Sequence, residues 1–258
     1  MRNQLLKNFS ISFLVSFLVV SISFAHPASV ELKDSAGVFI SSHASIQEAY
    51  NAIPATVSQA YIIEILSAYT GASEVYPINF SVRTGTSSVN TITLRPAAGN
   101  TGETISATAS GQPILLLDDA DFVIVDGRPG GVGSAADLTF ENLATTSSSF
   151  TFRLLNGATN NSIRYCIIKN NTMNVAGPRA IEIGTSVSNP TGNSDNLIED
   201  NEIVDLARPG KEKFYSKEKC FSVEIIVNLE PKPWNAEKIT FEQVIVLAYG
   251  NYDSDPRK

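Results

Sequence analysis

The stretches "NSIRYCIIKNN" (161–171) and "NLIEDNEIVDL" (196–206) decide the fold, because they repeat one pattern. The shared pattern is Asn-x-Ile-x-x-Cys/Asn-x-Ile, formed by Asn161, Ile163, Cys166 and Ile168 and again by Asn196, Ile198, Asn201 and Ile203. In a parallel β-helix each coil stacks its inward aliphatic side chains and its turn asparagines on the coil before, and stacked asparagines hydrogen-bond in ladders. A β-sandwich gives no reason for such a recurrence. The repeat therefore predicts a parallel β-helix.

The segment before the repeat consists of short strand patterns joined by turn residues. Each pattern is rich in β-branched or aromatic residues and is bounded by Gly, Pro, Asn, Asp or Ser. These patterns are "AYIIEIL" (60–66), "NTITLRP" (90–96), "PILLLDDADFVIVDG" (113–127), "DLTFENL" (137–143) and "SFTFRLLNG" (149–157). Strands without intervening helices predict a mainly β architecture.

One short helix is predicted ahead of these strands. Ser45 and Glu48 have the spacing of a capping box, and Pro54 ends the pattern. The apolar positions at i, i+3, i+4 and i+7 are Ile46, Ala49, Tyr50 and Ile53. We expect an amphipathic helix that covers an apolar surface.

The N-terminus predicts export from the cell. Arg2 and Lys7 precede an apolar run from Ile11 to Phe24, and Ser23 and Ala25 are small residues at −3 and −1 of a cleavage site. The run is too short and too rich in serine for a membrane span. We therefore interpret residues 1–25 as a signal peptide and expect a secreted or cell-surface protein without a membrane span after cleavage. An uncleaved anchor is the alternative.

Charge divides the chain near residue 209. Residues 1–209 contain 18 acidic and 11 basic side chains, whereas residues 210–258 contain eight of each. Neither part forms the basic stripe that a nucleic-acid backbone requires, so no nucleic acid is expected as a partner. The two cysteines, Cys166 and Cys220, lie in different parts and imply no disulfide framework.

Three segments of the first part occur in an order that a known family shares. They are "SIQEAYNAIP" (45–54), "ITLRPAAGNTGETISATASGQPILLLDDADFVIVDGR" (92–128) and the Asn-x-Ile coils. This order resembles the right-handed parallel β-helix, or pectate-lyase-like, region of secreted and surface proteins of type 9 secreting bacteria. The resemblance covers about residues 40–207, within a domain that we place at 26–207. It implies that the short helix caps the N-terminal end of the β-helix.

An acidic stretch, "LLLDDADFVIVDGR" (115–128), contains the candidate site residues. Polysaccharide lyases of similar fold use acidic residues for Ca²⁺ and a basic residue to remove a proton beside a uronate carboxyl. The catalytic candidates are Asp119, Asp121, Asp126 and Arg128, and the Ca²⁺ candidates are Asp118, Asp119 and Asp121. The stretch also fits a strand, an acidic turn and a second strand. We favour this structural interpretation, because no second carboxylate cluster recurs at the coil period.

Residues 220–258 follow a different pattern. Apolar residues alternate with polar ones from Phe221 to Val227, and "PKPWN" (231–235) fits an edge strand because Pro231 and Pro233 cannot donate to a ladder. A capping box then opens a helix in "FEQVIVLAYG" (241–250). The sequence predicts a β-hairpin followed by a helix.

That order resembles the start of a repeat in the bacterial multiubiquitin family, a ubiquitin-like β-grasp. The resemblance is carried by "FSVEIIVNLEPKPWNAEKITFEQVIVLAYGNYDSDP" (221–256). It implies conjugation enzymes as partners only if later strands and a C-terminal glycine complete the domain. The charged segment "RPGKEKFYSKEK" (208–219) is expected to be a solvated linker or fusion seam. We expect the chain to be a chimera of two unrelated fragments.

The leading functional hypothesis is a secreted or cell-surface scaffold of the adhesin type, non-catalytic and bound to a polysaccharide or another surface component. Aromatic side chains could act as sugar platforms, but the available ones show no even spacing: Tyr61, Tyr69, Tyr76, Phe80 and Phe140. The first alternative is a fragment of a polysaccharide lyase or glycosidase, for which Ca²⁺ is the possible cofactor. The second is a ubiquitin-like modifier or binding module, unable to conjugate as the chain stands.

Overall fold

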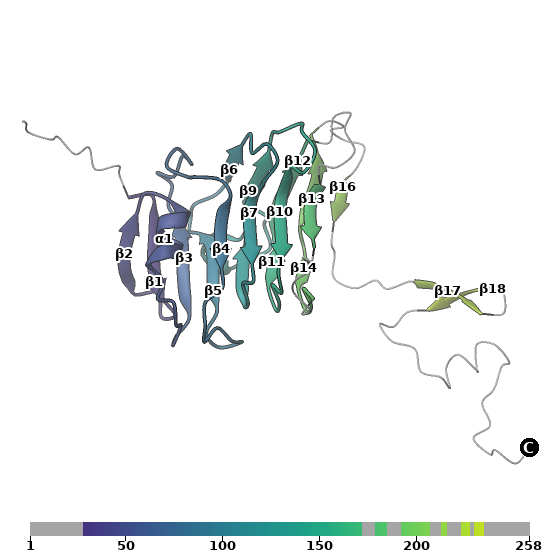
Figure 1. The fold of residues 1–258 in the computed structure, drawn as a ribbon, viewed down its shortest axis with the longest axis horizontal. Coiled ribbons are helices and arrows are strands. Elements are labelled where there is room, and N and C mark those ends of the chain that lie inside the picture. Colours follow the sequence, from purple (N-terminus) through teal and green to yellow (C-terminus); the bar gives the residue numbers. More distant parts are fainter. Residues whose placement is uncertain are drawn as a thin grey trace, which may run out of the picture.

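The coils that the structure describes form a β-solenoid of about 4 turns (Figure 1). The computed structural model describes residues 28–171, 179–184 and 192–206, together with the backbone of strands at 213–215, 223–227 and 230–234. Within the described coils, consecutive turns stack through parallel strands. The parallel β architecture expected from the repeat is confirmed.

Three parallel sheets run along the solenoid. Sheet 1 contains β3 (Tyr61–Ile65), β5 (Ile92–Pro96), β8 (Val123–Asp126), β11 (Ser162–Arg164) and β14 (Leu197–Glu199). Sheet 2 contains β6 (Glu103–Ala107), β9 (Leu138–Asn142), β12 (Cys166–Asn170) and β15 (Glu202–Asp205). Sheet 3 contains β4 (Ile78–Ser81), β7 (Pro113–Asp118), β10 (Phe150–Leu155) and β13 (Arg179–Ile183). From β5 onward the chain visits the sheets in the order 1, 2, 3.

The register of the repeat is the one that the sequence predicts. Ile163 pairs with Ile198 in sheet 1, and Ile168 pairs with Ile203 in sheet 2. Ile163 and Ile168 are buried, and they continue columns of inward residues that fill the solenoid. The strand patterns upstream are confirmed as well, since each contains at least one strand of the solenoid.

An antiparallel hairpin and one helix lie at the N-terminal end of the solenoid. β1 (Val30–Asp34) pairs with β3 on one side and with β2 (Phe39–His43) on the other. The predicted helix is confirmed as α1 (Ile46–Ala52), whose N-cap Ser45 accepts a hydrogen bond from the backbone of Glu48. Tyr50 of α1 stacks on Phe80 of β4, with ring centroids 4.2 Å apart. The helix is therefore packed onto the first turn of the solenoid.

In the second part of the chain, the described residues form three short strands. β16 (Lys213–Tyr215) pairs antiparallel with β15, so three residues of the expected linker extend sheet 2. The open edge of a sheet offers unpaired backbone groups, and a following segment can satisfy them. β17 (Val223–Val227) and β18 (Glu230–Trp234) form the predicted antiparallel pair.

Two predicted segments lie outside the described residues, namely the signal peptide at 1–25 and the helix at 241–250. Within the part of the chain that the structure describes, no helix is long and apolar enough to cross a membrane.

Candidate functional site

The acidic turn between β7 and β8 is bonded to the next coil. Asp118 accepts a hydrogen bond from the Asn156 side chain at 2.6 Å. Asp121 accepts two from Thr159, from its backbone N–H at 2.8 Å and its hydroxyl at 2.6 Å. Two of the three Ca²⁺ candidates thus join neighbouring coils. The structure agrees with the strand, turn and strand that the sequence favours here.

The third Ca²⁺ candidate, Asp119, is exposed and has a left-handed backbone, with φ of 54°. The pKa of Asp119 is raised, first by partial burial and then by the negative charges of Asp121 and Asp118. Among the described residues, no group of three or more His, Cys, Asp or Glu side chains is arranged to hold a metal ion.

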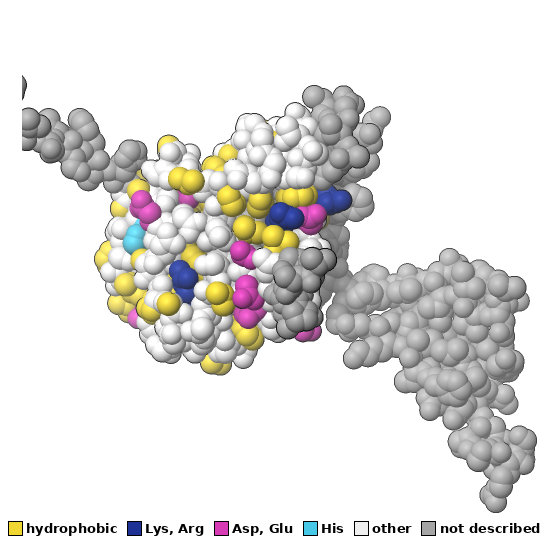
Figure 2. All heavy atoms as spheres, viewed as in Figure 1, with side chains coloured by type: hydrophobic (Ala, Val, Ile, Leu, Met, Phe, Trp, Pro, Cys, Tyr) yellow, Lys and Arg dark blue, Asp and Glu magenta, His cyan; other side chains and the backbone are white. Residues whose placement is uncertain are grey.

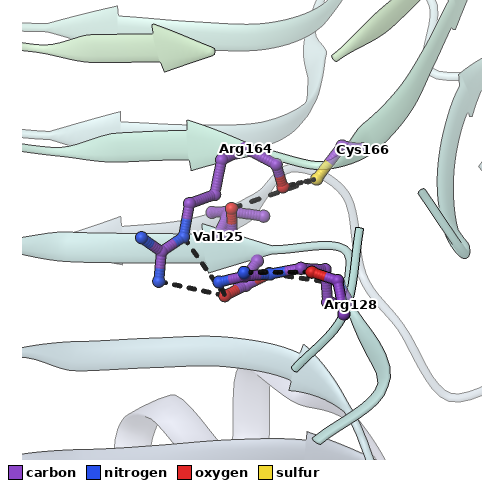
Figure 3. A network of polar contacts seen from close by, with 6 residues as sticks. Val125, Arg128, Arg164 and Cys166 are labelled. Atoms are coloured by element: carbon purple, nitrogen blue, oxygen red, sulfur yellow. Dashed lines mark hydrogen bonds and ion pairs between the residues drawn. The ribbon is translucent and has the colours of Figure 1, made fainter. Parts of the chain in front are cut away.

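Asp126 occupies the opposite end of β8 and forms a network of polar contacts with Arg128 and Arg164 (Figure 3). Its side chain is almost fully buried, with 1% of the residue exposed. Arg128 donates to both carboxylate oxygens, from Nε at 2.8 Å and Nη2 at 2.7 Å. Arg164, from the next coil, approaches the Oδ2 atom with Nη2 at 3.0 Å. Asp126 therefore binds its own turn to the coil that follows.

This network controls the ionisation of Asp126. Burial opposes the charged form, but the hydrogen bonds from the Arg128 side chain and backbone and the positive charges of Arg164 and Arg128 outweigh it. The pKa of Asp126 consequently lies below its ordinary value. A carboxylate held ionised between two guanidinium groups is a structural anchor and a poor proton donor.

The candidate residues do not converge on one site. Asp126 and Arg128 are in contact, whereas Asp118, Asp119 and Asp121 precede β8. Asp121 and Asp126 are five residues apart along the chain, which is up to about 16 Å at roughly 3.3 Å per extended residue. A lyase site requires the metal ligands and the base to face one sugar ring.

Two residues that sequence reasoning missed complete the Asp126 network. Arg164 pairs in register with Asp126 on one side and Glu199 on the other. The Arg128 guanidinium lies over the Tyr165 ring, 4.3 Å from its centroid. The sequence signal for Arg164 was the opposite charge of Glu199 at the equivalent position of the second repeat, because directly paired opposite charges stabilise a sheet.

The same arrangement recurs along the outer side of sheet 1. Buried Glu64 contacts Lys33 of β1 and Arg95 of β5, each at 2.6 Å. Burial opposes ionisation of Glu64, but the hydrogen bonds and charges of Lys33 and Arg95 lower its pKa. Residues of alternating charge therefore follow one another from coil to coil: Glu64, Arg95, Asp126, Arg164 and Glu199.

Cys166 adjoins the network but is part of the core. It is a free cysteine with no exposed surface, and its Sγ lies 3.2 Å from the carbonyl oxygen of Arg164 (Figure 3). Burial raises the pKa of this thiol. A thiol kept protonated in the interior is a poor nucleophile.

Most of the aromatic residues considered as sugar platforms are also core residues. Tyr61, Tyr69, Phe80 and Phe140 are between 0% and 7% exposed. A sugar ring cannot stack on a side chain that the core covers. Tyr165, partly exposed at a coil corner, was not among the sequence candidates.

Comparison of the chain with protein-family models, with curated proteins and with solved structures found no match. The fold and the contacts between the coils are therefore the basis for a functional proposal.

Proposed function

We propose that residues 26–207 form a secreted or cell-surface scaffold of the adhesin type, which binds a polysaccharide or another surface component without catalysis. The observation that carries this proposal is the use of the candidate acids in contacts between coils. Asp118, Asp121 and Asp126 are each bonded to the following coil, which stiffens the solenoid and occupies at least one carboxylate oxygen of each residue. A rigid body with hydrogen-bonding outer faces suits display or adhesion.

Several finer features belong to the same proposal. The coils wind in the right-handed sense that parallel crossovers favour. Helix α1 caps the N-terminal end of the solenoid, which is supported by the burial of Ile46, Ala49 and Tyr50 beneath it. Residues 1–25 direct export, and the mature chain begins at His26.

The experiment is a binding screen of the mature protein against immobilised polysaccharides and whole bacterial surfaces. We expect saturable binding to at least one polysaccharide or surface fraction, with heat-denatured protein as the control for non-specific adsorption. Failure to bind any of them, by a folded sample, would contradict the proposal.

The lyase alternative is tested on the same sample. Incubation with polyuronates and Ca²⁺ should give no unsaturated product if the scaffold proposal is right. If product forms, the variants Asp119→Asn and Asp121→Asn distinguish an intrinsic activity from a contaminant, because only an intrinsic activity that uses these acids is lost with them. Such a loss would replace the scaffold by the enzyme fragment.

A second candidate function concerns residues 220–258, as a ubiquitin-like modifier or binding module. The pairing of β17 with β18 favours it, since a β-hairpin opens the ubiquitin-like β-grasp that the sequence resembles. Sequencing of the locus beyond Lys258 tests it. A continuation that ends in glycine, next to genes for conjugation enzymes, would support the modifier, and a stop codon without such neighbours would exclude it.

A further inference from the structure

Strand β2 presents an apolar edge at the N-terminal end of sheet 1. β1 and β2 extend the five parallel strands of sheet 1 to a sheet of seven strands. β2 is the terminal strand of that sheet and pairs with β1 along one side. Three consecutive residues are largely exposed where this strand begins: Val38, which directly precedes β2, at 59%, Phe39 at 53% and Ile40 at 45%. Hydrophobic side chains are visible along the left border of the described body in Figure 2, where Figure 1 places β2.

This edge lacks the charges that usually keep sheet edges apart. Native edge strands are protected by Lys and other charged residues, by Pro, by bulges or by a covering element. Residues 35–44, "SAGVFISSHA", contain no Lys, Arg, Asp, Glu or Pro. A bulge is present at Ile40, because Lys33 pairs with Phe39 while Leu32 pairs with Ser41. The bulge bends the edge but leaves Ile40 exposed.

A terminal strand of a solenoid normally carries a polar outer surface, which keeps copies of the protein apart. At the other end of sheet 1, β14 has Glu199, and Asp200 follows it. Two copies that met at β14 would bring these acids together. At β2 the same encounter brings no like charges together, although the whole chain has a net charge of −7.

We propose that β2 is a homodimer interface, in which two copies of the protein pair β2 against β2 and bury Val38, Phe39 and Ile40. A two-fold axis at this edge makes the two β2 strands antiparallel, and antiparallel edge strands can hydrogen-bond directly to each other. Sheet 1 then continues from one copy into the other. This interface is independent of any polysaccharide and goes beyond the proposed adhesive function.

Sedimentation equilibrium of the mature full-length chain tests the interface. We expect a dimer for the unchanged protein, and Phe39→Glu should weaken dimerisation by about tenfold or more. Val75→Glu is the matched control, because Val75 is 77% exposed and lies outside β2. Both substitutions replace an exposed side chain, so circular dichroism should show folded protein for each.

Covalent trapping supplies a second measurement. In a Cys220→Ser background, Ile40→Cys should form an intermolecular disulfide under mild oxidation, while Val75→Cys should not. The remaining native cysteine, Cys166, is buried and cannot contribute. A monomer at the highest soluble concentration would overturn the proposal. So would a dimer that Phe39→Glu and Val75→Glu weaken equally, since its contact would lie elsewhere.

Discussion

Asn161 donates its side-chain amide to the Oδ1 atom of Asn196, 3.0 Å away and 35 residues later in the chain. The same amide also donates to the carbonyl of Ala120 at 2.8 Å, and Asn161 Oδ1 accepts from the backbone of Val123 at 2.9 Å. One side chain, 2% exposed, therefore links three successive coils. This is the asparagine ladder that the repeat predicts.

Replacement of Asn161 by alanine should destabilise the solenoid by about 2–4 kcal/mol. The variant leaves a buried N–H and a buried carbonyl without partners, and each such group costs roughly 1–3 kcal/mol. Urea unfolding followed by circular dichroism measures the loss. The control is Asn160→Gly, which retains the left-handed backbone (φ of 56°) at an exposed residue and should change stability by less than about 0.5 kcal/mol. Equal losses of stability in the two variants would contradict a stabilising role for the asparagine ladder.

Removal of the Asp126 charge should destabilise the protein at neutral pH. Asp126→Asn leaves Arg128 and Arg164 without their carboxylate, and we expect a loss of about 2–4 kcal/mol. The loss should fall short of that for a fully buried pair, because the Arg164 side chain is 31% exposed. The control is Arg179→Gln, whose side chain is 57% exposed and pairs with Glu182 on its own strand, and it should cost less than about 1 kcal/mol.

Asp126 should also make the stability of the protein sensitive to acid. The folded-state pKa of Asp126 is lowered, so its contribution is fully present above its ordinary pKa of about 3.9 and is lost as pH falls through the lower folded value. Glu64, whose pKa is also lowered, acts in the same direction. Urea midpoints of the unchanged protein should therefore fall steeply in acid. The urea midpoint of Asp126→Asn should depend less steeply on pH. Parallel pH dependences of the two proteins would show that the Asp126 carboxylate does not cause the acid sensitivity.

Gly127 should tolerate no side chain. A Cβ atom there would lie 1.8 Å from the backbone oxygen of Tyr165 in the next coil, and backbone cannot move aside as a flexible side chain can. We expect Gly127→Ala to cost about 3 kcal/mol or more, or to prevent folding. Gly192→Ala is the control, since no heavy atom lies within 4 Å of its added Cβ. Thermal melts of both variants give the comparison, and equal melting temperatures would show that the coils can separate at this corner.

The coils were predictable because their physical cause is local and periodic. Ile163 and Ile168 recur as Ile198 and Ile203, and inward residues must recur when one coil stacks on another. The capping box at Ser45 is likewise a local signal, and α1 begins where it predicts. By contrast, the N-terminal hairpin of β1 and β2 was not foreseen, since its pairing with β3 depends on contacts between distant segments.

The candidate site was harder to predict for the same reason. Asp126 and Arg128 are close in sequence, and their contact is local. The contacts of Asp118 with Asn156 and of Asp121 with Thr159 depend on the length of an entire coil, because the partners are 38 positions apart in each case. The sequence shows that acids are clustered, but only the stacking register shows that these two acids bind the neighbouring coil.

Limited proteolysis should locate the boundary between the two parts of the chain. We expect the first tryptic cuts between Pro209 and Lys219, where four lysines follow one another: Lys211, Lys213, Lys217 and Lys219. Arg153 and Lys169 lie within paired strands of the solenoid, so the backbone beside them should resist cleavage. Because Lys213 belongs to β16, which pairs with β15, the earliest cuts should follow Lys211, Lys217 or Lys219.

Mass spectrometry of the fragments identifies the sites, and a protease specific for glutamate should cut at Glu212 or Glu218 as an independent check. Equal protection of this segment and the coils would mean that the solenoid and the second part form one continuous structure.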